Sequence, residues 1–368
     1  YWGLRDYGVG GQIGLEKVLD CLGWATGNSC GTCYICRMVE VFREVRRVLR
    51  NDGTCWVNIG DSYHGGGKGN YGNGKSVSVH KNHLTNPGLA PGAKPKDLCL
   101  VPARLALALQ ADGWWIRSEI IWAKKSPMPE SVTDRPTSAH EKIWLMSKSK
   151  TYYYDVEAVR EKAEASTISR CERILISSKS KIGFEQGLKY MNPATEEAYG
   201  ERQIESGSRN LRNVWFMSTE PFLDAHFAVF PTEIPRRAIR AGTSEKGVCP
   251  DCGAPWKRNV EVGGGCIGQG WNDHSHDAEH GNIATDPRSK VGNGYYRRTT
   301  GWSPSCACPE ADPVPATVLD PFVGSGTTAL VAHREGRRFI GIDLKTEYLD
   351  MAARRIAAAG YPQERFAL

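Results

Sequence analysis

Two patterns of apolar positions alternate along the chain. Some segments have apolar residues at a helical period, and others are the continuous apolar runs typical of buried strands. From Arg37 to Arg50 apolar positions recur every three or four residues, which predicts an amphipathic helix. Asn51-Asp52-Gly53 then supplies residues that end a helix. Thr54–Ile59 predicts a buried strand that delivers Asp61 just beyond its carboxyl end. The apolar face of the helix consists of Met38, Val41, Phe42, Val45, Val48 and Leu49.

The pattern continues with a second helix and two further strands. Val101–Ala111 predicts a helix, with Pro102 in its first turn and Gly113 beyond its end. Trp115–Trp122 and Lys142–Ser147 predict strands. Alternating strands and helices favour an α/β fold, a mainly parallel sheet with helices on both faces. Ligands of such sheets bind outside the carboxyl ends of the strands, where Asp61 falls.

The C-terminal stretch repeats this alternation around a glycine-bearing turn. A strand at Thr317–Leu319 leads into the turn Asp320–Gly326, and a helix follows at Thr327–Arg334. A second strand, Arg338–Ile342, ends on Asp343. The glycines of the turn let the backbone approach a ligand closely, and the helix that follows offers unpaired N–H groups. An acid at the tip of the next strand is placed to accept both hydroxyls of a ribose. These features predict a site for a nucleoside cofactor.

A dinucleotide such as NAD is one candidate for this site. Gly324, Gly326 and Ala329 fit the pattern G-x-G-x-x-A, with Asp343 at a suitable distance. Asp320-Pro321-Phe322, however, puts a carboxylate and a ring where a pyrophosphate needs clear backbone. The printed chain also stops one helix after Asp343, so the remaining strands must come from earlier in the sequence. An NAD-dependent oxidoreductase is therefore kept only as the weaker alternative.

In motif content and order the chain resembles the amino-methylating DNA methyltransferases of the permuted, beta order, in a branch found in phages and prophages. DPFVGSGTT resembles the cofactor loop of that family, and GIDL its ribose-binding acid. His226–Ile239 resembles the element that closes over the methionine moiety. The beginning YWGLRDYG, NIGDSY at Asn58–Tyr63, and Ile121–Lys148 complete the match.

The resemblance implies a Rossmann-like sheet in permuted order, S-adenosylmethionine as cofactor and double-stranded DNA as partner. It implies methyl transfer to the exocyclic amine of cytosine (N4) or adenine (N6). Tyr1 is expected to stack on the target base and Asp61 to line the pocket. Phe230 and Pro231 are expected near the methionine end. The residues expected to bind the cofactor are Asp320, Pro321, Phe322, Gly324, Gly326, Thr327 and Asp343.

The catalytic tetrapeptide of the family, (S/D/N)-P-P-(Y/F), is not present in full. Tyr1-Trp2-Gly3 resembles the end of S-P-P-Y-W-G, and no Pro-Pro dipeptide occurs in the chain. We therefore expect a fragment with impaired activity. A zinc-containing DNA-binding protein without catalysis remains the alternative, as does a complete protein that has lost catalysis.

Twelve cysteines indicate metal binding more than catalysis. None follows a proline, which argues against the Pro-Cys nucleophile of carbon-5 cytosine methylation. The groups Cys249, Cys252, Cys306, Cys308 and Cys21, Cys30, Cys33, Cys36 each offer four thiolates, the number that structural zinc requires. One or two zinc ions are therefore predicted. Histidines at 274, 276 and 280 could replace a cysteine of the first group. Buried thiols, disulfides and, for the second group, an iron–sulfur cluster remain open.

Composition agrees with a cytoplasmic enzyme of several parts. The chain has 368 residues, 40% of them hydrophobic, and a net charge of +6. No apolar run approaches a membrane span, so no membrane partner is expected. Between His64 and Asp97 lies a basic loop rich in glycine and asparagine that is suited to gripping phosphates.

Five segments are predicted from these patterns. They are a catalytic half at 1–150, a target-recognition region at 151–220, a cofactor-closing element at 221–242, a zinc-ribbon-like insert at 243–310 and a cofactor-binding half at 311–368.

Overall fold

The fold is seen in a computed structural model that describes residues 10–64, 94, 96–162, 208–220, 230–263, 296–309 and 311–360. The chain divides into two compact units. The first contains Tyr1–Tyr154, Arg212–Thr243 and Pro315–Leu368, and the second contains Asp155–Leu211 and Ser244–Val314. Within the described ranges, no helix has both the length and the apolar character needed to cross a membrane.

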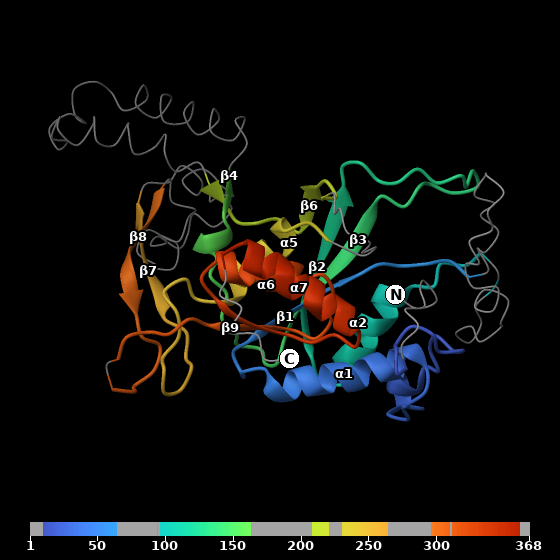
Figure 1. The fold of residues 1–368 in the computed structure, drawn as a ribbon, viewed down its shortest axis with the longest axis horizontal. Coiled ribbons are helices and arrows are strands. Elements are labelled where there is room, and N and C mark those ends of the chain that lie inside the picture. The colour runs from blue at the N-terminus through green and yellow to red at the C-terminus, as the bar shows by residue number, and fades with distance from the viewer. Residues whose placement is uncertain are drawn as a thin grey trace, which may run out of the picture. The chain divides into compact units, whose positions relative to one another are not determined.

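The first unit is built on a four-stranded sheet in the order β1-β3-β2-β6 (Figure 1). Its strands are β1 (Thr54–Ile59), β3 (His140–Ser147), β2 (Trp115–Lys124) and β6 (Val214–Met217). β3 runs antiparallel to both β1 and β2, whereas β2 and β6 are parallel. The sheet is thus mixed, and the expectation of a mainly parallel sheet is wrong for β3. The carboxyl ends of β1, β2 and β6 still point the same way.

Two helices cover one face of this sheet. α1 (Tyr34–Val48) and α2 (Val101–Ala111) contact each other and bury a shared core with β1. α1 begins three residues before the predicted start because Cys33 caps it, its side chain accepting the N–H of Cys36. A short 3₁₀ helix, η1 (Gly23–Thr26), precedes α1. The core contains Leu19, Ile35, Phe42, Val57, Ile59, Leu105, Leu109 and Met146.

The opposite face of the sheet meets α5 (Glu233–Gly242). Gly242 lies so close to β1 that an added Cβ would come within 2.4 Å of Thr54 Oγ1. The guanidinium of Arg237 stacks over the ring of Trp215, 5.1 Å from its centroid. Trp215 in turn lies beside Trp56, with ring centroids 6.3 Å apart. The sheet therefore carries helices on both faces, as its pattern predicts.

The C-terminal part of the first unit forms a second, smaller sheet. β9 (Thr317–Asp320) and β10 (Arg338–Gly341) pair in parallel, with Thr317 opposite Arg338 and Asp320 opposite Gly341. α6 (Thr327–Arg334) connects them and α7 (Thr346–Ala358) follows, and these helices pack together (Figure 1). Val323, Ala329, Leu330 and Ile356 form the core between these elements.

The two sheets are not hydrogen-bonded to one another among the described residues. β1 pairs only with β3, and β9 pairs only with β10. This differs from the expected single Rossmann-like sheet, because each of these strands has a hydrogen-bonded neighbour on one side alone. The link between the sheets is α5, whose Ile239 packs against Val331 and Ala332 of α6.

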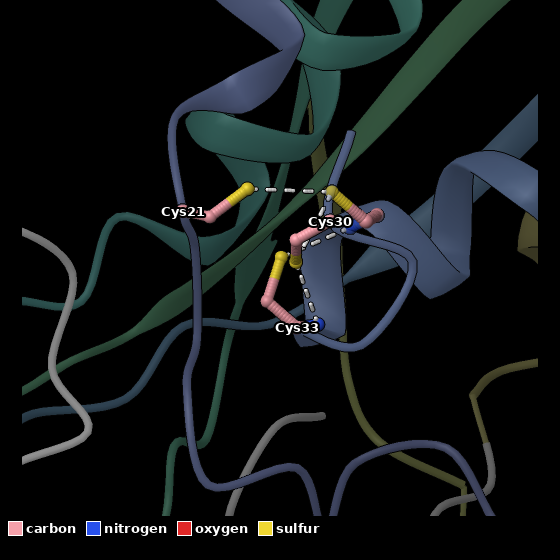
Figure 2. A group of neighbouring side chains, drawn as sticks. Cys21, Cys30 and Cys33 are labelled. Atoms are coloured by element: carbon pink, nitrogen blue, oxygen red, sulfur yellow. Dashed lines mark hydrogen bonds between the residues drawn. The ribbon is translucent and has the colours of Figure 1, made fainter. Parts of the chain in front are cut away.

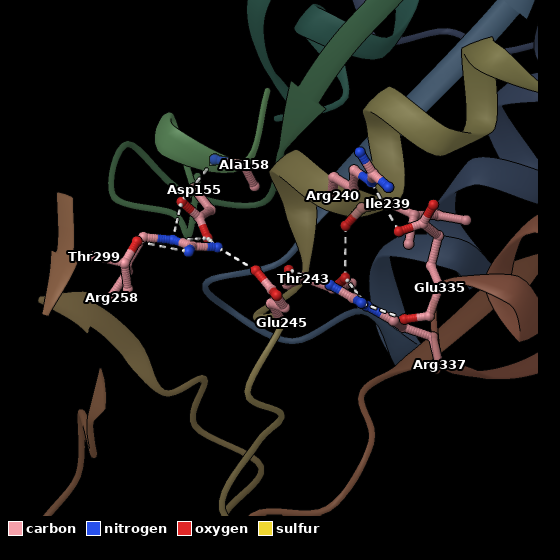
Figure 3. A network of polar contacts seen from close by, with 10 residues as sticks. All are labelled: Asp155, Ala158, Ile239, Arg240, Thr243, Glu245, Arg258, Thr299, Glu335 and Arg337. Atoms are coloured by element: carbon pink, nitrogen blue, oxygen red, sulfur yellow. Dashed lines mark hydrogen bonds and ion pairs between the residues drawn. The ribbon is translucent and has the colours of Figure 1, made fainter. Parts of the chain in front are cut away.

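Two arginines, the buried Arg337 and the exposed Arg240, fasten α5 to the turn between α6 and β10 (Figure 3). Arg337 donates to the hydroxyl of Thr243 at 2.9 Å and to the carbonyls of Thr243 and Glu335. Arg240 on α5 pairs with the Glu335 carboxylate at 2.8 Å. The end of α5 is therefore held by the same segment that starts β10.

The second unit contains two antiparallel pairs, β4 (Glu161–Lys162) with β5 (Ser208–Arg209) and β7 (Lys257–Gly263) with β8 (Tyr296–Ser303). Arg258 on β7 forms ion pairs with two acids of this unit, with Asp155 at 3.0 Å and with Glu245 at 2.6 Å (Figure 3). Arg297 pairs likewise with Glu157. Parts of the predicted target-recognition region and of the predicted insert thus fold together. A 3₁₀ turn, η2, spans Glu157–Val159.

Candidate functional site

The turn after β9 is held by its own acid. Asp320 ends β9, and its Oδ1 accepts the backbone N–H of Phe322 at 2.9 Å. Its carbonyl accepts the N–H of Ile342 at 2.9 Å, which extends the pairing with β10 by one residue. Pro321 is half-buried and Phe322 is exposed. The turn therefore leaves β9 in a fixed direction with the phenyl ring facing solvent.

Asp343 joins the turn to the end of β10. Its Oδ2 accepts the N–H of Gly324 at 3.0 Å, and its Oδ1 accepts the N–H of Lys345 at 2.9 Å. Each oxygen of a carboxylate has two lone pairs, so each retains one for a further donor. Two parallel strand ends, a glycine turn and an acid thus meet at one place, as the sequence predicts.

Close packing demands glycine at position 326. Gly326 precedes α6 with φ at 79°, a left-handed conformation that glycine tolerates. A Cβ on it would lie 2.7 Å from the Cβ of Ala352 on α7. The start of α6 therefore presses directly on α7, and the N–H groups of its first turn face outward from a rigid base.

Arg355 on α7 braces the same turn, and sequence reasoning missed it. Its Nη1 donates to the hydroxyl of Thr327 at 2.8 Å, to the carbonyl of Ser325 at 3.2 Å and to the hydroxyl of Ser325 at 3.3 Å. Thr327 and Ser325 are buried. No motif marks Arg355, because it lies about 30 positions from its partners and only the packing of α7 brings it there.

The surroundings of the turn disfavour a negative charge on Asp320. Burial raises the pKa of Asp320, the nearby charge of Asp343 raises it further, and hydrogen bonds from Thr328 and Phe322 oppose these effects. Two carboxylates close together are relieved when a positive charge arrives between them.

Phe230 and Pro231 come directly before α5, Phe230 half-buried and Pro231 buried. The next residue, Thr232, donates its hydroxyl to Glu220 at 2.9 Å. Burial, foremost, and the charge of Arg334 lower the pKa of Arg355, and the charge of Glu220 opposes that shift. The predicted methionine-side residues thus lie next to a residue, Thr232, that contacts Glu220.

Of the predicted catalytic residues, only Asp61 lies within the described residues, and its described contacts are at the start of α2. Asp61 Oδ1 accepts the N–H of Val101 at 3.0 Å and of Ser62 at 2.9 Å, so it fixes the start of α2. Burial raises the pKa of the Asp61 carboxyl, and the hydrogen bonds from Val101 and Ser62 oppose this increase. Tyr1 lies outside the described residues, as do most of the basic loop between His64 and Asp97, positions 163–207 of the target-recognition region, and the three histidines at 274, 276 and 280.

Four thiols converge at the start of α1, those of Cys21, Cys30, Cys33 and Cys36, and we call this group the N-terminal cluster. Figure 2 shows Cys21, Cys30 and Cys33. All four sulfurs lie within 4.8 Å of one another. Cys21 Sγ is 3.5 Å from Cys36 Sγ, and Cys30 Sγ is 3.9 Å from it. Among the described residues, no cysteine is part of a disulfide. The predicted grouping is therefore confirmed as a spatial cluster.

A second group converges in the other unit, the hairpin cluster (Cys249, Cys252, Cys306 and Cys308). Its sulfurs also lie within 4.8 Å of one another. The pKa of Cys249 is lowered to about 7, chiefly by a hydrogen bond from the N–H of Cys252 and also by one from the N–H of Asp251. Cys249 and Cys252 precede β7 and the other two follow β8, so the cluster joins the two ends of the hairpin.

Comparison with known proteins shows which family the chain resembles. A family model described as "DNA methylase" matches residues 25–252 and 313–354. The Type II methyltransferase M.Cfr9I of Citrobacter freundii is 34% identical over 97% of this chain and 78% of its own length. The Type II methyltransferase M.SmaI of Serratia marcescens is 33% identical over 97% of this chain and 81% of its own.

Among solved structures, the PvuII DNA methyltransferase, described as cytosine-N4-specific, matches with a TM-score of 0.45 at 15% identity, covering 90% of this chain and 73% of that one. Family membership rests on the sequence matches, and it argues against the oxidoreductase alternative. The chain belongs to the N6/N4 DNA methylase family.

Proposed function

We propose that this protein transfers a methyl group from S-adenosylmethionine to the exocyclic amine of cytosine (N4) or adenine (N6) in double-stranded DNA. The observation that carries the proposal is the hydrogen bond from Gly324 N–H to Asp343, which joins the glycine turn to the acid of the next strand. Together with membership of the DNA methylase family, this geometry supports a nucleoside cofactor at the ends of β9 and β10.

The residues of the turn fit such a cofactor. The free lone pairs of Asp343 would accept the two ribose hydroxyls, because vicinal hydroxyls match the two oxygens of a carboxylate. Glycine at 326 lets the start of α6 pack directly against α7, which fixes the N-terminus of α6 beside the turn. Phe322, whose ring is exposed, offers an apolar surface for the ligand. Arg355 would act as a positioning residue, since it holds Ser325 and Thr327 and not the ligand.

The negative charge of the turn suits the methionine end. When bound, S-adenosylmethionine supplies a methyl group on a positively charged sulfur. An ionised Asp320 would attract that positive charge, and a cation there would oppose the effect of burial, which raises the pKa of this carboxyl. The segment from Phe230 to Thr232 would close over this end and exclude water.

For methyl transfer, the target base must first leave the DNA duplex. A base amine is a weak nucleophile because its lone pair is delocalised into the ring, so positioning and preorganised polar groups must carry the reaction. A flipped base is held by stacking on an aromatic ring, a role we assign to Tyr1.

Two measurements test the proposal. Calorimetry with S-adenosylhomocysteine and with NAD should detect binding of the first only; binding of NAD alone would end the proposal. Methyl transfer from radiolabelled S-adenosylmethionine to DNA is then compared for the chain as printed and for a form with Ser-Pro-Pro and a preceding strand placed before Tyr1.

The extended form should label DNA, and nucleoside analysis of the product should identify N4-methylcytosine or N6-methyladenine. A folded, cofactor-bound extended form that labels no DNA would favour a zinc-containing DNA-binding protein without catalysis. A matched extended form with Tyr1→Ala should retain cofactor binding and lose most of the labelling.

A further inference from the structure

The two cysteine clusters share a geometry that the methyltransferase chemistry does not use. In each cluster four thiols lie within 4.8 Å of one another. Four thiols rarely gather without a reason, since a cysteine that only fills space behaves as a small apolar residue and needs no second sulfur beside it.

Sulfur separations distinguish the possible occupants. Four sulfurs placed about 2.3 Å from one zinc ion at tetrahedral angles lie about 3.8 Å apart. In the N-terminal cluster, Cys36 Sγ is 3.5 Å from Cys21 Sγ and 3.9 Å from Cys30 Sγ. A disulfide would bring two sulfurs to about 2.05 Å. An iron–sulfur cluster would need room for several iron and sulfide atoms between the thiolates, and this spacing admits one ion.

Backbone donors point at the sulfurs of the N-terminal cluster. Cys21 Sγ faces the N–H of Gly23 at 3.2 Å, and Cys30 Sγ faces the N–H of Cys33 at 3.3 Å. Cys33 Sγ faces the N–H of Cys36 at 3.4 Å. A neutral thiol is a weak acceptor, whereas a metal-bound thiolate carries charge that such donors stabilise. This is a second observation, independent of the spacing, that indicates metal ligands.

The N-terminal cluster lies where one ion would join several segments. Cys21 precedes η1 and Cys33 caps α1 (Figure 2). Cys36 lies in the first turn of α1. Asp20, fully buried beside Cys21, pairs with Arg104 on α2 at 3.1 Å. An ion at the cluster would therefore hold the turn, α1 and α2 in one arrangement next to the core formed around Leu19 and Ile35.

The hairpin cluster has a related role in the second unit. β7 and β8 pair from Lys257 opposite Ser303 to Gly263 opposite Tyr296. Two ligands precede β7 and two follow β8, so an ion would tie the open end of the hairpin. Val248 and Val314 already pair their backbones there, with N···O distances of 2.8 and 2.9 Å. The sulfurs of this cluster thus lie beside a backbone pairing that already holds the two ends of the hairpin together.

We propose that the chain holds two structural zinc ions, one in each cluster, each bound by four thiolates. Four sulfurs complete the tetrahedral shell, so no position is left for a water or a substrate and neither ion takes part in methyl transfer. Each zinc would replace the protons of its thiols, and the chain would lose stability when the metal is removed.

Metal analysis of the full-length protein tests this directly. Protein purified without chelators should contain two zinc per chain by mass spectrometry. Cys30→Ser and Cys252→Ser should each remove one zinc, and the double variant should remove both. The matched control Cys55→Ser, a thiol on β1 outside both clusters, should retain two. Circular dichroism reports whether each variant is folded.

A second readout keeps the test decisive if a variant fails to fold. The wild-type protein is stripped of metal under reducing conditions and refilled with Co²⁺, which should take up two ions with the intense visible absorption of tetrahedral thiolate sites. No bound metal in either preparation would overturn both sites. Iron with acid-labile sulfide would overturn zinc. If the wild type holds a single zinc that is lost in Cys252→Ser but kept in Cys30→Ser, the N-terminal site is overturned. If the single zinc is lost in Cys30→Ser but kept in Cys252→Ser, the hairpin site is overturned.

Discussion

The backbone N–H of Gly324 donates to Oδ2 of Asp343 at 3.0 Å, so a turn after one strand is fixed by the acid that follows the next. The parallel register places Asp320 opposite Gly341, two residues before Asp343. The strand ends, the turn and the acid therefore form a single structure, and a change in any of them should alter ligand binding. This relationship leads to four predictions.

Replacing Asp343 with alanine should weaken S-adenosylhomocysteine binding. The variant loses the charge-assisted bonds to the ligand hydroxyls and to Gly324, a loss of about 1–3 kcal/mol in binding free energy. Isothermal titration calorimetry measures the change. Asp350→Ala, an exposed acid on α7, is the control and should bind as the wild type does. Equal affinities in the two variants would mean that Asp343 does not contact the ligand.

Replacing Gly326 with alanine should destabilise the first unit more than replacing Gly336 does. Both glycines have positive φ, 79° and 72°, and alanine in that region costs about 1–2 kcal/mol. At Gly326 the new Cβ also meets Ala352, whereas at Gly336 nothing lies within 4 Å. Overpacking should add about 1–3 kcal/mol. Urea unfolding of the two variants gives the difference, and equal losses would show that α6 and α7 are not in contact there.

Arg355→Ala should loosen the glycine turn. Three hydrogen bonds to Ser325 and Thr327 are lost, and the buried acceptors remain without this donor, at a cost of about 1–3 kcal/mol in unfolding free energy. Cofactor affinity should fall with it, because the turn becomes less rigid. Arg354→Ala, the exposed neighbour, should change neither quantity. Unfolding and calorimetry on the same two variants test both effects.

Stability should depend on pH through Asp320. Burial raises the pKa of this carboxyl in the folded state, so ionisation is more costly there than in the unfolded chain. The wild type should therefore lose stability as the pH rises from about 4, the ordinary carboxyl range, through the raised value. Asp320→Asn should lack this component. Unfolding free energies of both proteins across that range should diverge with rising pH, and parallel curves would contradict the raised pKa.

Local sequence predicted most elements to within a few residues. The strand at Thr54–Ile59 and the helices at Val101–Ala111 and Thr327–Arg334 have the predicted bounds, because each has a clear period and a clear stop signal. The start of α1 was misplaced, since Cys33 caps the helix and a capping cysteine is not a usual signal. β3 was found, but its antiparallel direction was not, because direction depends on which strand lies beside it.

The candidate site shows the same division. The glycine turn and Asp343 were predicted from spacing alone, and their hydrogen bond confirms that they meet. Arg355 was missed, because its partners lie on another helix. Asp61 was predicted as part of the pocket wall, a role that stays a prediction; in the structure it fixes the start of α2.

The sequence by itself determined the family, the order of the cofactor motifs and the identity of the eight clustered cysteines, since each depends on residue types at short spacings. Tertiary structure alone decided which distant groups meet. Arg258 joins two segments of the second unit, Arg355 braces the turn, and β1 and β9 lie in different sheets. The physical reason is that contacts between distant segments depend on how whole elements pack, and no local pattern of residues records that choice.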